Sequence, residues 1–217
     1  VRSLFIENGA TVQTTGSISS GGALYLMTDN DSIVSSSLFL NNQAVWASAV
    51  FAGALSYQEQ TSASLTNNTF VGNSGNAALR LTNAMIDLRN NTFWKNAAPT
   101  GSGNIAAHLL VNGAQTQLQA LSNNLFAHTD GGANACASFS LPEPDLVGSG
   151  HNLFTDNSCH FIDSNSLIIG GDLRIRGLRF TNASDTMPAV ELLAGSPAID
   201  NGSPETPGTS TASACMA

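Results

Sequence analysis

The chain has 217 residues, of which 42% are hydrophobic and only 10% are charged, so its surface must be covered largely by uncharged polar residues and Gly. Its net charge is −8, with seven Lys and Arg residues and no basic run. This excludes nucleic acid and an anionic membrane surface as expected partners, because little is available to neutralise phosphates. No apolar run approaches the roughly 18 residues of a membrane helix, so no direct membrane span is expected.

A Phe followed three residues later by Asn or Thr recurs six times. The successive Phe residues lie 23 to 34 positions apart, a period typical of solenoids and not of a domain with one closed core. Three of the units read Asn-Asn-x-Phe in full, and a fourth, His151–Phe154, keeps the second Asn. The six pairs are Phe5/Asn8, Phe39/Asn42, Phe70/Asn73, Phe93/Asn96, Phe126/Thr129 and Phe154/Asn157.

Each repeat unit predicts three short strands and three corners. Segments before the Asn pair alternate apolar and polar residues, as in 63–66 and 85–89, which indicates strands. The Asn pair marks a corner, because Asn tolerates the left-handed backbone region. A second strand carries the Phe, and a small-residue segment such as 76–81 follows.

Parallel stacking of these units places Phe on Phe and hydrogen-bonds Asn to Asn along the axis. We therefore expect an all-β fold, a right-handed parallel β-helix of six to eight coils. The coils span residues 1–162, and a C-terminal capping segment of the same domain spans 163–217, where the Phe repeat stops and charges cluster. The predicted ladder and stack residues are Asn68, Asn91, Asn124, Asn152, Phe70, Phe93, Phe126 and Phe154.

Three Cys residues allow one disulfide and leave one thiol over. Cys136 and Cys159 lie about one repeat apart, so they are able to face each other on neighbouring coils, and in a secreted protein we expect them to be bonded. Two free, buried thiols are the alternative. Cys215 lies in a Ser/Thr-rich tail, and any partner of it would lie beyond the sequence.

Segments 149–153, 156–159 and 192–202, the last reading Leu-Leu-Ala-Gly-Ser-Pro-Ala-Ile-Asp-Asn-Gly, together resemble the C-terminal part of bacterial choice-of-anchor Q domain proteins. The resemblance covers about residues 130–217, and the earlier coils are similar to the repeats of polymorphic outer-membrane β-helices. It implies a secreted or surface-attached β-helix with a structural or adhesive role and no agreed catalytic residues. In the family, a Cys resembling Cys215 is followed by a segment leading to an anchor, so the end at Ala217 indicates a truncated or processed chain.

The Ser-Pro-Ala-Ile-Asp stretch predicts a cap on the last coil. Pro197 fixes the backbone, Ala198 and Ile199 are expected to face that coil, and Asp200 is placed to accept backbone N–H bonds in a turn. A cap is needed because the last coil of a solenoid leaves a row of N–H and C=O groups open.

A carbohydrate-active enzyme, a polysaccharide lyase or glycoside hydrolase, is the alternative, because parallel β-helices host such enzymes. The segments 150–152 and 174–176 echo a polygalacturonase pattern, but its paired Asp residues are missing. A lyase needs carboxylates around Ca²⁺, and the carboxylates of the C-terminal half show no ligand-loop spacing. We therefore expect no cofactor and no metal site, with Ca²⁺ as a weak alternative. The carboxylates weighed are Asp130, Asp156, Asp163 and Asp172, and the His residues without metal-ligand spacing are His108, His128, His151 and His160.

Two Trp residues are the candidates for contact with a ligand or partner. Trp94 follows the inward Phe93 and should point outward beside Lys95, while Trp46 follows a corner. Either ring can stack on a sugar or anchor a protein, although a Trp covered by a neighbouring loop is the competing interpretation. The sequence thus predicts a non-catalytic, secreted or cell-surface bacterial module for adhesion or assembly. Its expected partners are other chains or further copies at the coil ends, and glycans.

Overall fold

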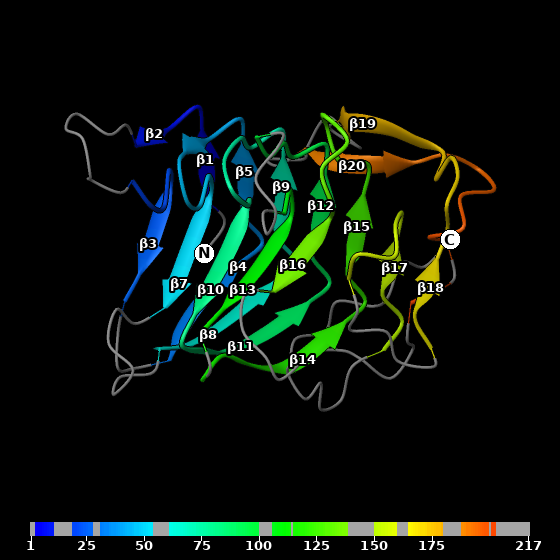
Figure 1. The fold of residues 1–217 in the computed structure, drawn as a ribbon. Coiled ribbons are helices and arrows are strands. Elements are labelled where there is room, and N and C mark those ends of the chain that lie inside the picture. Colours follow the sequence, from blue (N-terminus) through cyan, green and yellow to red (C-terminus); the bar gives the residue numbers. More distant parts are fainter. Residues whose placement is uncertain are drawn as a thin grey trace.

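The computed structural model describes residues 3–10, 19–27, 31–53, 61–99, 106–113, 115–138, 150–159, 165–179, 188–199 and 201–202. Every regular element in these ranges is a β-strand, and the strands stack into a parallel β-solenoid (Figure 1). The all-β class and the parallel stacking are therefore confirmed. None of these residues belongs to a helix of the length and apolarity that a membrane span requires. Asp200 and Cys215 lie outside the described residues.

Three parallel sheets run along the solenoid. The seven-stranded sheet, in spatial order, contains β1 (Leu4–Ile6), β5 (Leu38–Leu40), β9 (Thr69–Val71), β12 (Thr92–Trp94), β15 (Leu125–Ala127), β17 (Leu153–Phe154) and β18 (Leu167–Ile168). The five-stranded sheet contains β3 (Leu24–Leu26), β7 (Val50–Gly53), β10 (Leu79–Thr82), β13 (Leu109–Asn112) and β16 (Cys136–Ser138). The four-stranded sheet contains β4 (Ser32–Ser35), β8 (Thr61–Thr66), β11 (Ala84–Arg89) and β14 (Gln117–Ser122).

The chain passes through the four-stranded, seven-stranded and five-stranded sheets in turn and then begins the next coil. Because the smallest sheet has four strands, about four turns contribute a strand to every sheet. A short parallel pair, β2 (Gly9–Ala10) and β6 (Gln43–Ala44), lies beside the first of these turns. Residues at equivalent repeat positions are therefore direct neighbours across the sheets.

The Phe repeat forms the centre of the core. The register pairs Phe39 with Phe70, Phe70 with Phe93 and Phe93 with Phe126, and the five Phe side chains from Phe39 to Phe154 are fully buried. Neighbouring rings from Phe5 onward are stacked, with centroids 4.6 to 5.1 Å apart. This spacing follows from the distance between parallel strands, which is about 4.8 Å. The predicted Phe stack is thus present.

The Asn pairs form the corners before β9, β12 and β15. The first Asn of each pair is left-handed, with φ of 57° at Asn67, 56° at Asn90 and 55° at Asn123. Asn adopts this conformation at a lower cost than other non-Gly residues. The second Asn of each pair is buried in the corner, where its side chain donates to a backbone carbonyl of the preceding coil.

The C-terminal segment packs on the outer face of the seven-stranded sheet. An antiparallel pair, β19 (Ile175–Arg179) and β20 (Ala189–Leu192), lies near β12 and β15 (Figure 1). Leu173 is fully buried in a cluster with Ala127 and Leu153, against which Ile175 and Ala198 also pack. Pro197 lies in a turn in which the Ser196 hydroxyl donates to the Leu173 carbonyl at 2.6 Å. The segment therefore covers a flank of the solenoid, while closure of the coil end by this turn stays a prediction.

Candidate functional site

The first ladder consists of the buried Asn residues that precede β9, β12, β15 and β17, which are Asn68, Asn91, Asn124 and Asn152. Asn91 shows its geometry: its backbone N–H donates to Asn124 Oδ1 at 2.9 Å, and its Nδ2 donates to the same oxygen at 3.0 Å and to the Leu65 carbonyl at 2.8 Å. Its own Oδ1 accepts two hydrogen bonds from Asn68, at 3.0 and 3.1 Å. Each amide therefore joins three coils. The ladder ends on Ser166, whose Oγ accepts from Asn152.

A second Asn ladder follows the Phe strands, and the sequence analysis did not predict it. Asn8, Asn42, Asn73 and Asn96 repeat the same pattern, with Asn73 donating from N and Nδ2 to Asn96 Oδ1 at 2.9 Å in each case. The sequence signal for it is the Asn three residues after Phe5, Phe39, Phe70 and Phe93. The next coil has Thr129 at this position, so the ladder stops at Asn96.

His108 is the hydrogen-bond partner of Asn96, the last Asn of the second ladder. Its Nδ1 lies 3.0 Å from Asn96 Nδ2 and is fully buried, with its ring tilted against Phe93 and Phe126. Asn96 Oδ1 already accepts from Asn73, so the Asn96 amide must donate to His108. The imidazole is therefore neutral, with its proton on Nε2. The pKa of His108 is lowered to about 3, chiefly by burial and to a smaller extent by His128, while the Asp156 carboxylate and the Ala127 carbonyl act in the opposite direction.

The depressed pKa of His108 predicts a loss of stability in mild acid. The unfolded chain takes up a proton below the ordinary value of 6.5, whereas the folded chain does so only near 3. The stabilisation that the neutral His108 contributes is complete above pH 6.5 and is lost as the pH falls towards 3. Between about pH 6.5 and about pH 5, this should cost about 2 kcal/mol of the free energy of unfolding. Urea unfolding across this range should show a drop that His108→Gln, which keeps an acceptor for Asn96, lacks. Parallel pH profiles for the two proteins would reject this role.

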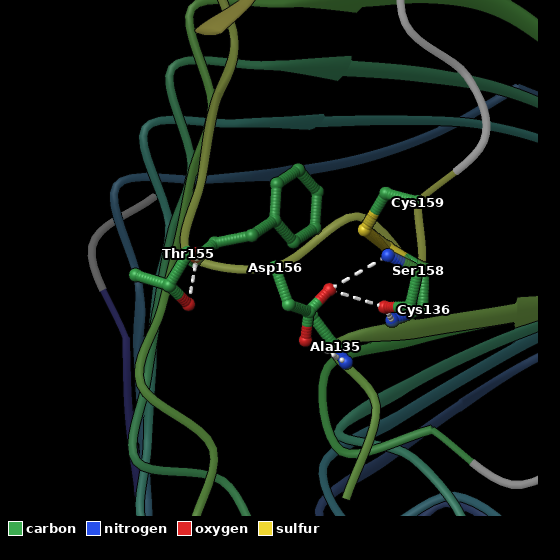
Figure 2. Close-up of a disulfide and its surroundings, with 7 residues drawn as sticks. Ala135, Cys136, Thr155, Asp156, Ser158 and Cys159 are labelled. Carbon is green, nitrogen blue, oxygen red and sulfur yellow. Dashed lines mark hydrogen bonds between the residues drawn. A yellow bond between two sulfur atoms is a disulfide. The ribbon is translucent and has the colours of Figure 1, made fainter. Parts of the chain in front are cut away.

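The predicted disulfide between Cys136 and Cys159 is present, with the two Cα atoms 4.8 Å apart. It joins Cys136 of β16 to Cys159, which lies in the segment after β17 (Figure 2). Beside it, the Asp156 carboxylate accepts hydrogen bonds from the N–H groups of Ala135 and Ser158, each at 2.9 Å, and from the Ser158 hydroxyl. The Cys136 N–H donates in turn to Ser158 Oγ at 3.0 Å. This carboxylate is thus occupied in holding two coils together.

Reduction of the disulfide should lower the free energy of unfolding by about 3 kcal/mol, because its two Cys residues are 23 positions apart and the bond restricts the unfolded chain. Unfolding by urea with and without reductant measures the difference. In the double variant Cys136→Ser/Cys159→Ser, reductant should have no effect. Alkylation of both thiols in the native protein without reductant would show that the bond is absent in solution.

Trp94 points out of the coil as expected, but the C-terminal segment covers much of it. Its ring packs with the cluster around Leu173, and a Cβ at Gly177 would lie only 3.1 Å from the ring. Gly177, with φ of 122°, is therefore required there twice over, by the close approach and by its backbone conformation. Lys95 Nζ lies 5.0 Å from the ring centroid. Trp94 is chiefly an anchor for β19.

Trp46 belongs to an aromatic column on the outer face of the five-stranded sheet. Tyr25, Phe51 and Arg80 are in register on β3, β7 and β10, and the Tyr25 and Phe51 rings stack at 4.6 Å. Arg80 lies over Trp46, with its Cζ 4.2 Å from the ring centroid. Arg80 is buried, and this desolvation lowers its pKa. Tyr25 is 43% exposed, so the column opens to solvent at its N-terminal end. We call Tyr25, Phe51, Arg80 and Trp46 the flank column.

The structure assigns structural contacts to several of the residues that were weighed for catalysis. Within the described ranges, no group of three or more His, Cys, Asp and Glu side chains is placed to hold a metal ion. His151 Nδ1 lies 3.2 Å from the Asn201 carbonyl, and Arg174 Nη1 donates to the Ala194 carbonyl at 3.0 Å. Both residues therefore make contacts with the C-terminal segment. Asp163 and His160 lie outside the described residues.

Comparison with protein-family models, curated proteins and solved structures gave no match for this chain. The resemblance to choice-of-anchor Q domain proteins therefore stays a prediction.

Proposed function

We propose that the protein is a non-catalytic structural or adhesion module that acts outside the bacterial cell. The observation that carries the proposal is the use of repeated positions for cohesion between coils. The Phe stack extends from Phe5 to Phe154, and the two Asn ladders run beside it. Successive coils are thus bonded through recurring contacts, which suits a rigid rod with a largely uncharged surface.

The finer features of the fold belong to this proposal. The winding is right-handed, as crossover connections between parallel strands almost always are. The seven-stranded sheet supports a total of six to eight coils. The disulfide supports an oxidising compartment and hence secretion to the cell surface or beyond. Membership of the choice-of-anchor Q domain proteins, with an anchor beyond Cys215, would fit this location.

The test is exposure of the purified protein to acidic and neutral polysaccharides. The expected result is retention of the protein on some of these polymers or on cells, with no shortening of the chains, and addition of Ca²⁺ should change neither outcome. Release of new reducing or unsaturated sugar ends by the wild-type protein would overturn the proposal in favour of a carbohydrate-active enzyme. Asp156→Asn serves as the control variant in the cleavage assay, and it should leave any such activity unchanged. Its carboxylate lies at the disulfide and accepts hydrogen bonds from backbone N–H groups.

Glycan binding is a second candidate role, favoured by the flank column. The exposed Tyr25 ring is held on Phe51 and so presents an apolar face that can stack on a sugar ring. Tyr25→Ala should weaken retention on a bound polysaccharide about tenfold, in line with the loss of one stacked aromatic side chain. Ile33→Ala, which alters an exposed apolar side chain of the four-stranded sheet, is the control. Equal retention of both variants would assign the binding to another surface.

A further inference from the structure

The corner between β13 and β14 contains an Asn–Gly pair, Asn112–Gly113, in which two groups that can react with each other are adjacent. The Gly113 N–H donates a hydrogen bond to Asn112 Oδ1 at 2.9 Å. The Gly113 nitrogen therefore lies against the side-chain amide of the residue before it. A nucleophile held in contact with a carbonyl group reacts far faster than one that meets it by diffusion, because little entropy remains to be lost.

The stacking of the coils requires Gly at position 113. Gly113 has a φ of 90°, and a Cβ at this position would collide with Asn83 Oδ1 in the preceding coil. Any other residue would be strained in both respects. Gly also leaves its nitrogen unshielded, since it carries no side chain that could stand between the nitrogen and the Asn112 amide.

The corner holds the Asn112 carbonyl while leaving the pair open to water. This carbonyl accepts hydrogen bonds from the Asn83 N–H at 3.2 Å and from the Thr116 hydroxyl. Both bonds make the N–H of the same peptide unit, that of Gly113, easier to deprotonate, because they stabilise the resulting negative charge. Asn112 and Gly113 are half-buried, so a base from the solvent reaches them.

We propose that Asn112–Gly113 is a site of self-modification, at which the Gly113 nitrogen attacks Asn112 Cγ and the side-chain amide leaves as ammonia. The Gly113 N–H proton passes to a base in the solvent. The bond from this nitrogen to Cγ forms, the Cγ–Nδ2 bond breaks, and Nδ2 takes up a proton as it leaves. The product is a succinimide ring, and no oxidation or reduction occurs. The inference does not depend on the proposed structural function.

One water molecule then opens the ring at either of its two carbonyl groups. If the bond from nitrogen to Cγ breaks, residue 112 becomes Asp and the backbone is unchanged. If the bond from nitrogen to the main-chain carbonyl carbon breaks, residue 112 becomes isoaspartate, and the backbone runs through its Cβ and Cγ. The hydrogen bonds from Asn83 and Thr116 then no longer hold the chain that leads into β14, so the isoaspartate form should unfold at a lower urea concentration.

The other two Asn–Gly pairs of the sequence, Asn8–Gly9 and Asn201–Gly202, are arranged differently. The Asn8 backbone N–H and Nδ2 both donate to Asn42 Oδ1, at 3.0 and 2.9 Å, so this amide is turned towards its own backbone nitrogen and away from that of Gly9. The Asn201 Nδ2 donates to the Pro197 carbonyl. Asn8 therefore serves as a control within the same molecule, with the same dipeptide in a different geometry.

Incubation of the native protein at mildly alkaline pH, followed by peptide mapping with mass spectrometry, tests the proposal. Asn112 should be converted to isoaspartate and Asp at least about tenfold faster than Asn8, because only the Asn112 amide is held against the nucleophile. The rate should rise with pH, since the reacting form of the Gly113 nitrogen is the deprotonated one. In protein unfolded by guanidinium chloride, the two Asn residues should be converted at similar rates.

Equal rates at Asn112 and Asn8 in the native protein would overturn the proposal, as would conversion of Asn112 that occurs only after unfolding. Both comparisons use the wild-type chain and need no variant that folds. Asn112→Gln keeps an amide but would have to close a larger ring, so incubation should not lower its urea midpoint. The matched variant Asn201→Gln removes a different Asn–Gly pair and should lose urea resistance as the wild type does. An Asn112→Gln protein that ages like the wild type would contradict the proposed effect on the corner.

Discussion

Phe93→Ala should lower the free energy of unfolding by about 4 kcal/mol, the loss typical of a fully buried aromatic side chain. The Phe93 ring lies between Phe70 at 4.6 Å and Phe126 at 4.8 Å, and it is completely buried. Its removal leaves a gap that neither neighbour is able to fill, because each is held in place by the strand register and by the next ring. Urea denaturation monitored by circular dichroism measures the change.

Phe5→Ala provides the matched control for this prediction. Phe5 contacts one ring of the stack, Phe39 at 4.7 Å, and is only partly buried, so its loss should be about half as large. Similar losses at the two positions would mean that the central ring is no more important than the terminal one. A marked fall in the denaturant dependence at Phe93→Ala would instead show that the variant divides the rod into separately unfolding parts.

The predictable part of the fold is the part that repeats. Each coil needs an inward aromatic residue at one position and a left-handed residue before it, and both needs restrict the residue type locally. Phe70 and Asn90 therefore carry a signal that recurs in the next coil, within the spacing of 23 to 34 residues. The paired Asn at 90 and 91 indicated a corner and a ladder together, and the structure places one of them in each role.

The unpredicted part depends on contacts between coils that differ. Asn73 stands without a second Asn, so its ladder was not recognised, although its hydrogen bonds are as short as those of Asn91. His108 has no repeat signal, and it contacts Asn96 at the point where the next coil has Thr129 in place of a ladder Asn. The cover on Trp94 comes from Gly177, which is distant in sequence and outside the repeat. Alternation along β12 predicts the direction of Trp94 but not what packs against it.

Asn91→Ala should also lower the free energy of unfolding by about 4 kcal/mol, because one amide serves groups in three coils. The variant removes the acceptor of the Asn68 N–H and the donor to the Leu65 carbonyl, and both groups stay buried in the corner. Each buried group left without a partner costs about 1–3 kcal/mol. Urea unfolding measures the sum of these losses.

A substitution at the neighbouring residue, Asn90, distinguishes the contribution of the ladder from that of the corner. Asn90→Gly keeps the left-handed backbone conformation at φ near 56° and leaves every ladder hydrogen bond intact, so it should change the free energy of unfolding by less than about 1 kcal/mol. If Asn91→Ala proved as mild as Asn90→Gly, the ladder would add little beyond the strand hydrogen bonds. The stability of the rod would then depend chiefly on the strand hydrogen bonds, the Phe stack and the disulfide, and the loss at Asn73→Ala in the second ladder should be equally small.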